Sequence, residues 1–373
     1  MDGSKAGALD CAWLGSLKRE IAMQKIAAIL FSAVAVVAIC GMPAPVRADD
    51  VVRAADGPFI TGGAFYVARD KGYFKKLGIT IETKQFFDGA VAVPSLVNGE
   101  LDISFMTPSA SLFNSVAKGA PMVVILDRGN NKPGSAYTVL NVRKELADGG
   151  IKTLKDVGKL KGMRVGANAL GSINHYQAAN ALLMAGLDPA KDVQWVLNIP
   201  QPDMMKMLGT NGVDAADLAY QFGFFAQNNG WGPIVVNGDE VSPNASIAMI
   251  AVHKDFLAKK RDVVVRFAMA YLQAAKEFNA AAAAPDKHAD IVEILAKNTA
   301  LNKPELVKAI APHWGYIAEN GLPSVDSIMK MQDFWSGKYY QLVEKKVTRE
   351  QLFDLSIANE AKARLDKEKP FGN

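Results

Sequence analysis

The stretch RVGANALGSINHYQAANALLMAGL, residues 164–187, has the pattern of a short buried strand, a turn and a helix. Residues 168–171 form the turn, because Asn and Gly tolerate the positive φ that tight turns need. Ser172 or Asn174 then caps the helix, since either side-chain oxygen can accept a hydrogen bond from a free N–H of the first helical turn. This arrangement places backbone N–H donors and the positive end of a helix dipole around one small pocket.

The pattern has two interpretations, namely half of a ligand cleft or an ordinary connection in an α/β domain. Taken alone, the stretch favours the ordinary connection, because such turns are common. A second stretch of the same kind, DGPFITGG at residues 56–63, lies between an expected strand at 51–55 and an expected helix at 64–71. Two such stretches in one chain favour the cleft.

The first 48 residues have the features of an export signal. Lys18, Arg19 and Lys25 supply positive charge before an apolar run at 26–39, which is too short to span a bilayer. The small-residue pattern at 46–48 predicts cleavage before Asp49, and Met23 is an alternative start. Lipid attachment at Cys40 and a retained anchor helix are the rival interpretations. Ile39 disfavours lipid attachment, because a lipoprotein signal has a small residue there.

Composition excludes several classes of function. Of the 373 residues, half are hydrophobic, which fits one or two globular domains with cores of their own. Without the five basic and three acidic residues of segment 1–48, 37 basic and 35 acidic residues remain, so we expect no nucleic-acid partner. The two cysteines, Cys11 and Cys40, both precede residue 49, so we expect neither a disulfide nor thiol chemistry after it. The four histidines show no metal-ligand spacing, and we expect no metal and no cofactor.

Strands and helices alternate at short spacing along most of the chain, which is typical of a parallel sheet covered by helices. We predict an α/β fold with two lobes, each a mostly parallel sheet flanked by helices, and a ligand cleft between the lobes. The first lobe takes residues 49–142 and 247–373, and the second lobe, 143–246, is inserted into it. Sheets of this type bind ligands at the carboxyl ends of their strands, and two facing lobes can close by a hinge.

Several segments resemble a known family. They are GYFKKLGITIE (72–82), PSLVNGELDISFMTPSASLFNSVAKGAPMVVI (94–125), LKDVGKLKGMRVGA (154–167) with the following Gly-Ser, AGLDPAKDVQWV (185–196), NGVDAADLAY (211–220) and TREQLFDLSIANEA (348–361). Together they resemble the periplasmic substrate-binding proteins of ABC importers, of the sulfonate, taurine, nitrate and thiamine-precursor type. The resemblance covers most of residues 50–366 and implies the type II periplasmic-binding fold.

The resemblance also implies where a ligand would be held. In that family the ligand contacts the first strand–helix turn, the turn after the second strand, a Thr/Ser-bearing turn of the first lobe and a helix start of the second lobe. A segment that closes the pocket follows. The corresponding residues here are Phe59, Ile60, Thr61, Gly62, Phe87, Asp88, Met106, Thr107, Ser109, Leu170, Gly171, Ser172, Ile173, Tyr220 and Phe222.

The chemistry of these residues fits an acidic ligand, with open alternatives. The hydroxyls of Thr61, Thr107, Ser109 and Ser172, with neighbouring N–H groups, can hold a carboxylate or sulfonate, or they simply cap helices. The aromatic rings either enclose the ligand or belong to the core. Arg128 follows a strand, where it either pairs with an anion or lies on the surface.

From these features we expect the periplasmic substrate-binding component of an ABC importer, which captures a small organic acid, a sulfonate or a carboxylate with an aliphatic or aromatic body. Its partners are the small-molecule ligand and an inner-membrane ABC permease, and the protein is a monomer. We expect no enzyme activity. The alternatives on the same fold are an enzyme like that of thiamine-pyrimidine synthesis, disfavoured by the lack of cysteine after Cys40, and a ligand-sensing protein.

Overall fold

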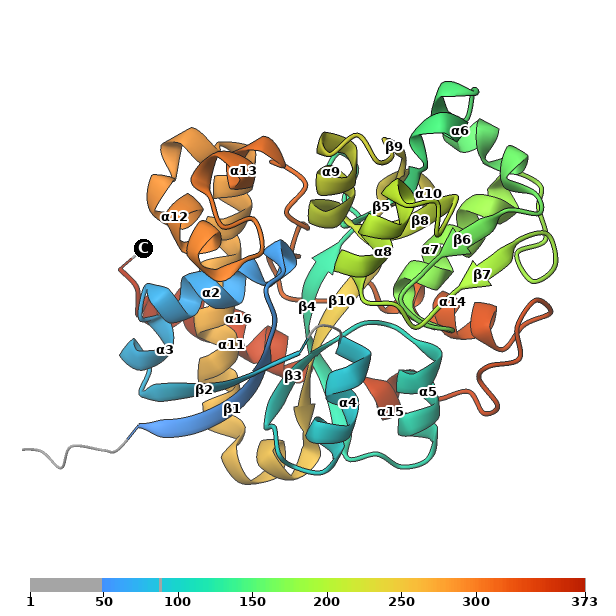
Figure 1. Cartoon of the computed structure of the whole chain (residues 1–373). Helices are drawn as coiled ribbons and strands as arrows, with labels where there is room; N and C mark the ends of the chain where they lie inside the picture. Colours follow the sequence, from blue (N-terminus) through green and yellow to red (C-terminus); the bar gives the residue numbers. More distant parts are fainter. Residues whose placement is uncertain (1–48, 87–88, 373) are drawn as a thin grey trace, which may run out of the picture. The chain divides into compact units, whose positions relative to one another are not determined.

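Ten strands form two five-stranded sheets, and helices flank each sheet (Figure 1). The computed structural model describes residues 49–86 and 89–372, and residues 49–373 cluster as one compact unit. The expected export signal and two of the expected ligand residues, Phe87 and Asp88, lie outside the described residues.

The first sheet has the order β2-β1-β3-β10-β4 and the second has the order β7-β6-β8-β5-β9. The strands of the first sheet are β1 (Asp50–Asp56), β2 (Ile79–Gln85), β3 (Ile103–Met106), β4 (Met122–Asn130) and β10 (Ser246–His253). Those of the second are β5 (Thr138–Val142), β6 (Arg164–Gly166), β7 (Gln194–Val196), β8 (Ala215–Ala219) and β9 (Ile234–Asn237).

One strand runs against the others in each sheet. β10 is antiparallel to β3 and β4, and β5 is antiparallel to β8 and β9, whereas the remaining pairs are parallel. The two-lobe α/β fold is therefore confirmed, with mixed sheets. The chain crosses between the sheets at 131–137 and returns just before β10. The first crossing comes earlier than the expected boundary at 143, because β5 lies in the second sheet.

Helices around the first sheet are α2 (Gly63–Asp70), α3 (Tyr73–Lys76), α4 (Gly89–Val97), α5 (Ala110–Ala117), α11 (Lys254–Ala283), α12 (Ala289–Asn298), α13 (Pro304–Ala309), α14 (Val325–Trp335), α15 (Arg349–Leu352) and α16 (Ser356–Glu368). Those around the second are α6 (Lys144–Asp148), α7 (Ile173–Met184), α8 (Gln201–Gly209), α9 (Tyr220–Asn228) and α10 (Gly238–Val241). Short 3₁₀ turns occur at Ile60–Gly62, Leu154–Leu160 and Pro285–Lys287.

Strands β3, β4 and β10 of the first sheet are buried on both faces, whereas the edge strand β2 is largely exposed. Along β4, Val123 and Ile125 pack on the side of α11, whereas Met122 and Val124 pack on the side of α4, α5 and α14. Successive side chains of a strand point to opposite faces, so a strand covered on both sides reads as a continuous apolar run. This explains why β4 was readable from the sequence.

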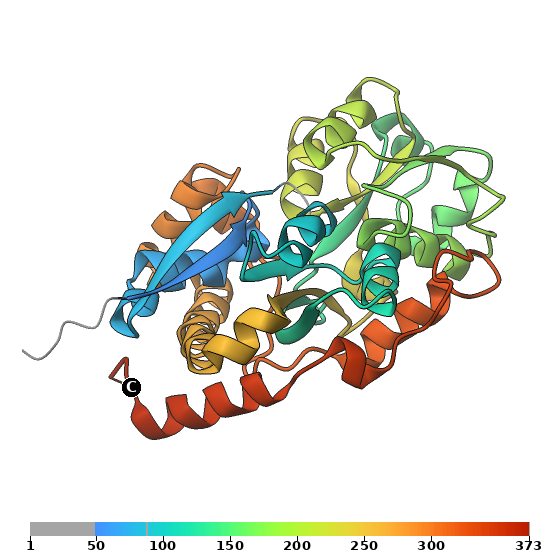
Figure 2. The ribbon, with the colours of Figure 1, turned by 90° about the horizontal axis from the view of Figure 1, so that it is seen from below.

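The C-terminal segment connects the two lobes from the outside. Helix α14 ends at Trp335, and the chain beyond it reaches the second lobe, where the Tyr340 hydroxyl donates to the Pro189 carbonyl at 3.1 Å. Figure 2 shows this segment continuing through α15 and α16 along one side of the molecule. α16 packs its buried residues Ile357, Ala358 and Ala361 into the cluster formed with α11.

Candidate functional site

The turns that follow the strands of both sheets meet in a cleft with two cavities. A small inner cavity of about 40 Å³ lies between the lobes, and its polar lining comes from Thr61, Thr107, Arg128, Thr138, Asn174 and Gln201. A larger outer cavity of about 500 Å³ adjoins it, with Val91, Ser109, Leu170, Ser172 and Ile199 in its lining, again with Gln201. Ligands of open α/β sheets bind at such strand ends.

Among the residues that the structure describes, Arg128 is the one charged side chain in the lining of the inner cavity. It lies near the end of β4 and is only 6% exposed. Its Nη1 donates to the Tyr137 hydroxyl at 3.3 Å, and its guanidinium lies 4.5 Å from the ring centroid of Phe105. Among the described residues no carboxylate forms an ion pair with it. A buried cation without an anion is costly, so this position is suited to an anionic ligand.

Neutral polar groups complete the inner cavity. Thr138 Oγ1 is buried and has no hydrogen-bond partner within the part of the chain that the structure describes. Gln201 Oε1 accepts from the Ala219 N–H at 2.7 Å, and Asn174 Nδ2 donates to Asp217 Oδ1 at 2.7 Å. Thr138 thus lines the cavity as a residue, while its buried hydroxyl oxygen lies beside Gly238.

A buried carboxyl group lies behind Asn174. Burial raises the pKa of Asp217 well above its usual value, and the hydrogen bond from Asn174 opposes this only in part. A raised pKa means that the group keeps its proton to higher pH. This raised pKa reduces the negative charge that Asp217 places behind the cavity.

Two of the expected ligand hydroxyls act as helix caps. Ser109 Oγ accepts from the Leu112 N–H at 3.2 Å, and Ser172 Oγ accepts from the His175 N–H at 3.2 Å. Both side chains also line the outer cavity. Capping, which the sequence left open as an alternative, is what these two oxygens do here.

The lobes contact each other directly beside the inner cavity. Phe59 packs into the apolar cluster of the second lobe, with its ring edge-on to Phe222 at 6.2 Å. Gln221 Oε1 accepts from the Ile60 N–H at 2.7 Å, and Gln221 Nε2 donates to the Pro58 carbonyl at 3.3 Å. We call these two hydrogen bonds of Gln221 the interlobe latch.

The structure places the expected ligand residues in three environments. Phe59, Thr61, Thr107, Arg128 and Ile173 line the inner cavity, and Ser109, Leu170 and Ser172 line the outer one. The others line neither: Ile60, Met106 and Phe222 are core residues, Gly62 packs on Tyr66 and Arg128, Gly171 packs on Ala110, and Tyr220 stacks on His313. Ligand binding by each of these residues stays a prediction.

Several lining residues were not predicted from the sequence. Thr138 begins a strand that the sequence analysis did not identify, and its strand signal is the β-branched segment at 138–142. Gln201 begins α8 directly after Pro200, which is a helix-start signal but not a binding signal. The role of Gln221 depends on a contact 161 residues away along the chain, which no local pattern reveals.

His175 lies in the core and not in the cleft. Its Nδ1 accepts from the Gly171 N–H at 3.1 Å, so the proton is on Nε2, which lies 3.1 Å from the Tyr340 hydroxyl. Burial lowers its pKa to about 3, and the Trp195 ring packs against it at 4.2 Å. His175 therefore anchors the C-terminal segment to the second lobe as a neutral side chain.

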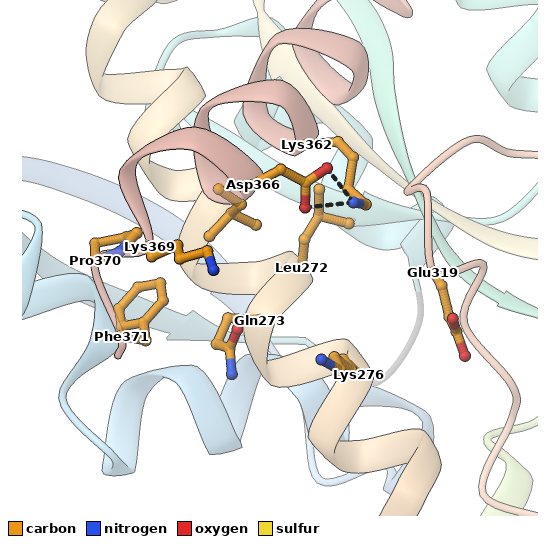
Figure 3. Close-up of a pocket in the computed structure, with 10 residues that line it drawn as sticks. Leu272, Gln273, Lys276, Glu319, Lys362, Asp366, Lys369, Pro370 and Phe371 are labelled. Carbon is orange, nitrogen blue, oxygen red and sulfur yellow. Dashed lines mark hydrogen bonds and ion pairs between the residues drawn. The ribbon is translucent and has the colours of Figure 1, made fainter. Parts of the chain in front are cut away.

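A second hollow, outside the cleft, has the wrong character for a ligand site. A groove of about 330 Å³ between α11 and α16 is lined by long charged side chains, and Lys362 pairs with Asp366 at 2.6 Å (Figure 3). Lys276, Asp366 and Lys369 are exposed. Exposed charges keep their hydration, so this groove lacks the buried, unpaired polar groups found beside Arg128.

The described residues offer neither a metal site nor a membrane-spanning helix. No group of three or more His, Cys, Asp or Glu residues there is placed to hold a metal ion. None of the helices there is long and apolar enough to cross a bilayer.

The two mixed sheets with a polar cleft at their strand ends have the architecture of periplasmic binding proteins. Residues 61–296 match the NMT1-like family, and the chain belongs to that family. A Bacillus subtilis (strain 168) protein named "Putative binding protein YtlA" is 22% identical over 209 residues, which are 56% of this chain and 60% of YtlA. The match thus spans less than two thirds of that relative's length.

Solved structures share the fold at low identity. The periplasmic nitrate-binding protein NrtA from Synechocystis PCC 6803 is 12% identical with a TM-score of 0.68, over 85% of this chain and 89% of its own. The periplasmic aliphatic sulphonate-binding protein SsuA from Escherichia coli is 18% identical with a TM-score of 0.63, over 82% of this chain and 92% of its own. At these identities the likeness shows the fold alone.

Proposed function

We propose that this protein is the substrate-binding component of an ABC importer and that its cargo is a small organic anion, a sulfonate or a carboxylate. The observation that carries the proposal is Arg128, a buried cation without an ion pair in the described structure, in a cavity between two lobes. Fold neighbours that bind nitrate and aliphatic sulphonates support an anionic cargo.

The geometry suggests how capture works. An anion at Arg128 also reaches Thr138, which begins the first strand of the second sheet, so one ligand contacts both lobes. A ligand that contacts both lobes binds the closed arrangement better than an open one and shifts the population towards it. The interlobe latch then adds its hydrogen bonds in the closed arrangement.

Delivery requires further partners. We propose that the protein acts as a monomer in the periplasm, after removal of an export signal, and that an inner-membrane ABC permease recognises the closed arrangement. The apolar run and small-residue pattern before Asp49 support export. We also propose that the chain is not an enzyme; the lack of cysteine after Asp49 disfavours the alternative of an enzyme like that of thiamine-pyrimidine synthesis.

The test is thermal unfolding of the purified protein with paired ligands. Alkyl sulfonates, aromatic carboxylates and nitrate are compared with neutral amides of the same carbon skeletons and with pyrimidines. A ligand at 100 times its dissociation constant adds about 2.7 kcal/mol to the free energy of unfolding, which raises the midpoint visibly. We expect a rise with an organic anion and none with its amide. A rise with neutral compounds alone would overturn the proposal.

A further inference from the structure

The inner and outer cavities are built by the same turns. The start of α4 supplies Gly89 to the inner cavity and Val91 to the outer one. In the same way, the turn before α7 supplies Ile173 to the inner cavity and Ser172 to the outer one, and Gln201 lines both. The two cavities are therefore successive parts of one path from Arg128 outwards.

The chemistry of the lining changes along this path. The inner part holds a cation and hydroxyls beside the rings of Phe59 and Phe105. The outer part has no charged side chain among the described residues and holds, besides several serines, two large apolar side chains exposed to solvent. Val91 is 65% exposed and Leu170 is 52% exposed, and they come from different lobes. A single exposed apolar side chain needs no explanation, but two in one cavity that continues a charged site indicate an apolar ligand group.

The volumes of the two cavities also fit a ligand with a small acidic group and a larger apolar body. About 40 Å³ accommodates an acidic group and little else, whereas about 500 Å³ is within the range of sites for whole organic molecules. We infer that the cargo is an amphipathic anion, with its acidic group at Arg128 and an apolar body lying between Val91 and Leu170. This inference rests on the proposed function and adds that Val91 and Leu170 determine specificity for the apolar body.

The inference predicts how affinity depends on chain length. Transfer of one methylene from water to an apolar environment contributes about 0.8 kcal/mol, which is roughly a fourfold change in affinity. The affinity for a series of acids with one head group should therefore rise roughly fourfold per methylene. The rise should stop when the outer cavity is filled.

The experiment measures calorimetric affinities for straight-chain carboxylates from acetate to decanoate and for the matching alkanesulfonates. The protein is purified from cells that express the whole chain. The test variant combines Val91→Ser with Leu170→Ser. We expect it to keep the affinity for the shortest acid that binds and to lose most of the rise with chain length. Both side chains are exposed, so we expect the fold to tolerate the change.

A matched control uses the other two large apolar side chains that are exposed in the described structure. Val51 and Met184 are 47% and 56% exposed and lie outside both cavities. We expect the variant with Val51→Ser and Met184→Ser to keep the native dependence on chain length. If it lost that dependence, the effect would be one of general surface hydrophobicity, and the inference would be wrong.

The remaining outcomes separate this inference from the proposed function. If short acids bind and native affinity does not change with chain length, the inference fails and the proposed function stands. If the test variant lowers the affinities for short and long acids equally, Val91 and Leu170 serve lobe closure and the inference also fails. If no acid of either series binds to the folded protein, while neutral compounds do, the proposed function itself fails.

Discussion

The two sheets have the same strand order, but the two lobes bring different chemistry to the cleft. β4 and β9 occupy the same edge position in their sheets. β4 ends with Asp127, Arg128 and two further residues, whereas β9 ends at Asn237, which caps a short helix. The first lobe therefore supplies the charge that attracts an anion, and the second lobe supplies neutral hydrogen-bonding groups that close over it.

The largest expected effect is that of removing this charge. In the variant Arg128→Met we expect at least a 100-fold loss of affinity for the anionic ligand, because a charge-assisted hydrogen bond to a buried partner is lost. We also expect an unfolding midpoint no lower than that of the native protein, since the cation has no ion pair in the described structure. Calorimetric titration and thermal unfolding measure the two effects.

Arg53 provides the control for this variant. It lies in β1 of the same lobe and pairs with Asp102 at 2.6 Å, outside both cavities. We expect Arg53→Met to keep native affinity. Unchanged affinity in Arg128→Met would show that the first lobe does not hold the anion through charge, and the contrast between the lobes would disappear.

The next comparison concerns one buried aspartate in each sheet. Burial raises the pKa of Asp127 in β4 from 3.8 to about 6, opposed by hydrogen bonds from the Ala318 N–H and the Ser246 hydroxyl. The folded state then holds more protons than the unfolded state between pH 4 and 6, so stability falls as pH rises through this range. This shift of the Asp127 pKa lowers the free energy of unfolding by roughly 3 kcal/mol across the range.

Asparagine variants test this difference. The free energy of unfolding of the native protein minus that of Asp127→Asn should fall between pH 4 and 6 and then become constant. For Asp217→Asn this difference should also fall as the pH rises, because burial raises the pKa of Asp217 well above its usual value and the hydrogen bond from Asn174 opposes this. Denaturant unfolding across pH measures both differences. Identical curves would mean that the two aspartates have equivalent surroundings.

A smaller effect is expected from the interlobe latch. In Gln221→Leu the buried Ile60 N–H loses its acceptor, which costs about 1 to 1.5 kcal/mol in the closed arrangement. We expect roughly tenfold weaker ligand binding and a larger radius of gyration of the unliganded protein by X-ray scattering.

The control for the latch is Gln227→Leu in the same helix. Gln227 accepts from the Ile234 N–H within the second lobe. This variant should lower stability without changing affinity relative to the native protein. If both variants behave alike, Gln221 supports its own lobe and is no latch.

The units of a strand followed by a helix could be predicted from the sequence, because the signals for them lie within each unit. Each strand followed by a helix has its own periodicity and its own turn, so β1, α2 and α7 were found close to their observed ends. β5 was missed because it follows β4 without an intervening helix, so the alternation on which the prediction relied is interrupted. That interruption is the crossing between the lobes.

Residues of the site could be predicted from the sequence only where they lie on turns near the ends of predicted strands. Arg128 was expected after a strand but lies within β4, just after its apolar run. Thr61 and Thr107 lie at turn ends, so position along the chain was sufficient to suggest all three. Thr138 and Gln201 enter the cavity only because the chain crosses between the lobes and the lobes face each other. Core rings such as Phe222 could not be separated from ligand-facing rings, since both are apolar residues beside a turn.

The smallest expected effect concerns Thr138, the first residue of the second sheet to follow the crossing. In Thr138→Val a methyl group replaces a buried hydroxyl that has no partner among the described residues. Removing an unpaired buried polar group is neutral or stabilising, so we expect an unchanged or higher unfolding midpoint. Affinity for the anion should fall about fivefold, because a hydrogen bond of about 1 kcal/mol is lost.

Thr299→Val is the matched control for this last prediction. Thr299 is also buried, but its hydroxyl oxygen accepts from the Leu301 N–H at 3.3 Å. We therefore expect the opposite result, a lower midpoint with native affinity, because the lost hydroxyl serves the fold and not the ligand. Removing a hydroxyl that forms a hydrogen bond within the protein lowers stability, whereas removing one that bonds only to the ligand does not. If Thr138→Val lowered the midpoint and left affinity unchanged, Thr138 would belong to the first kind, and the second lobe would hold the anion through Asn174 and Gln201 alone.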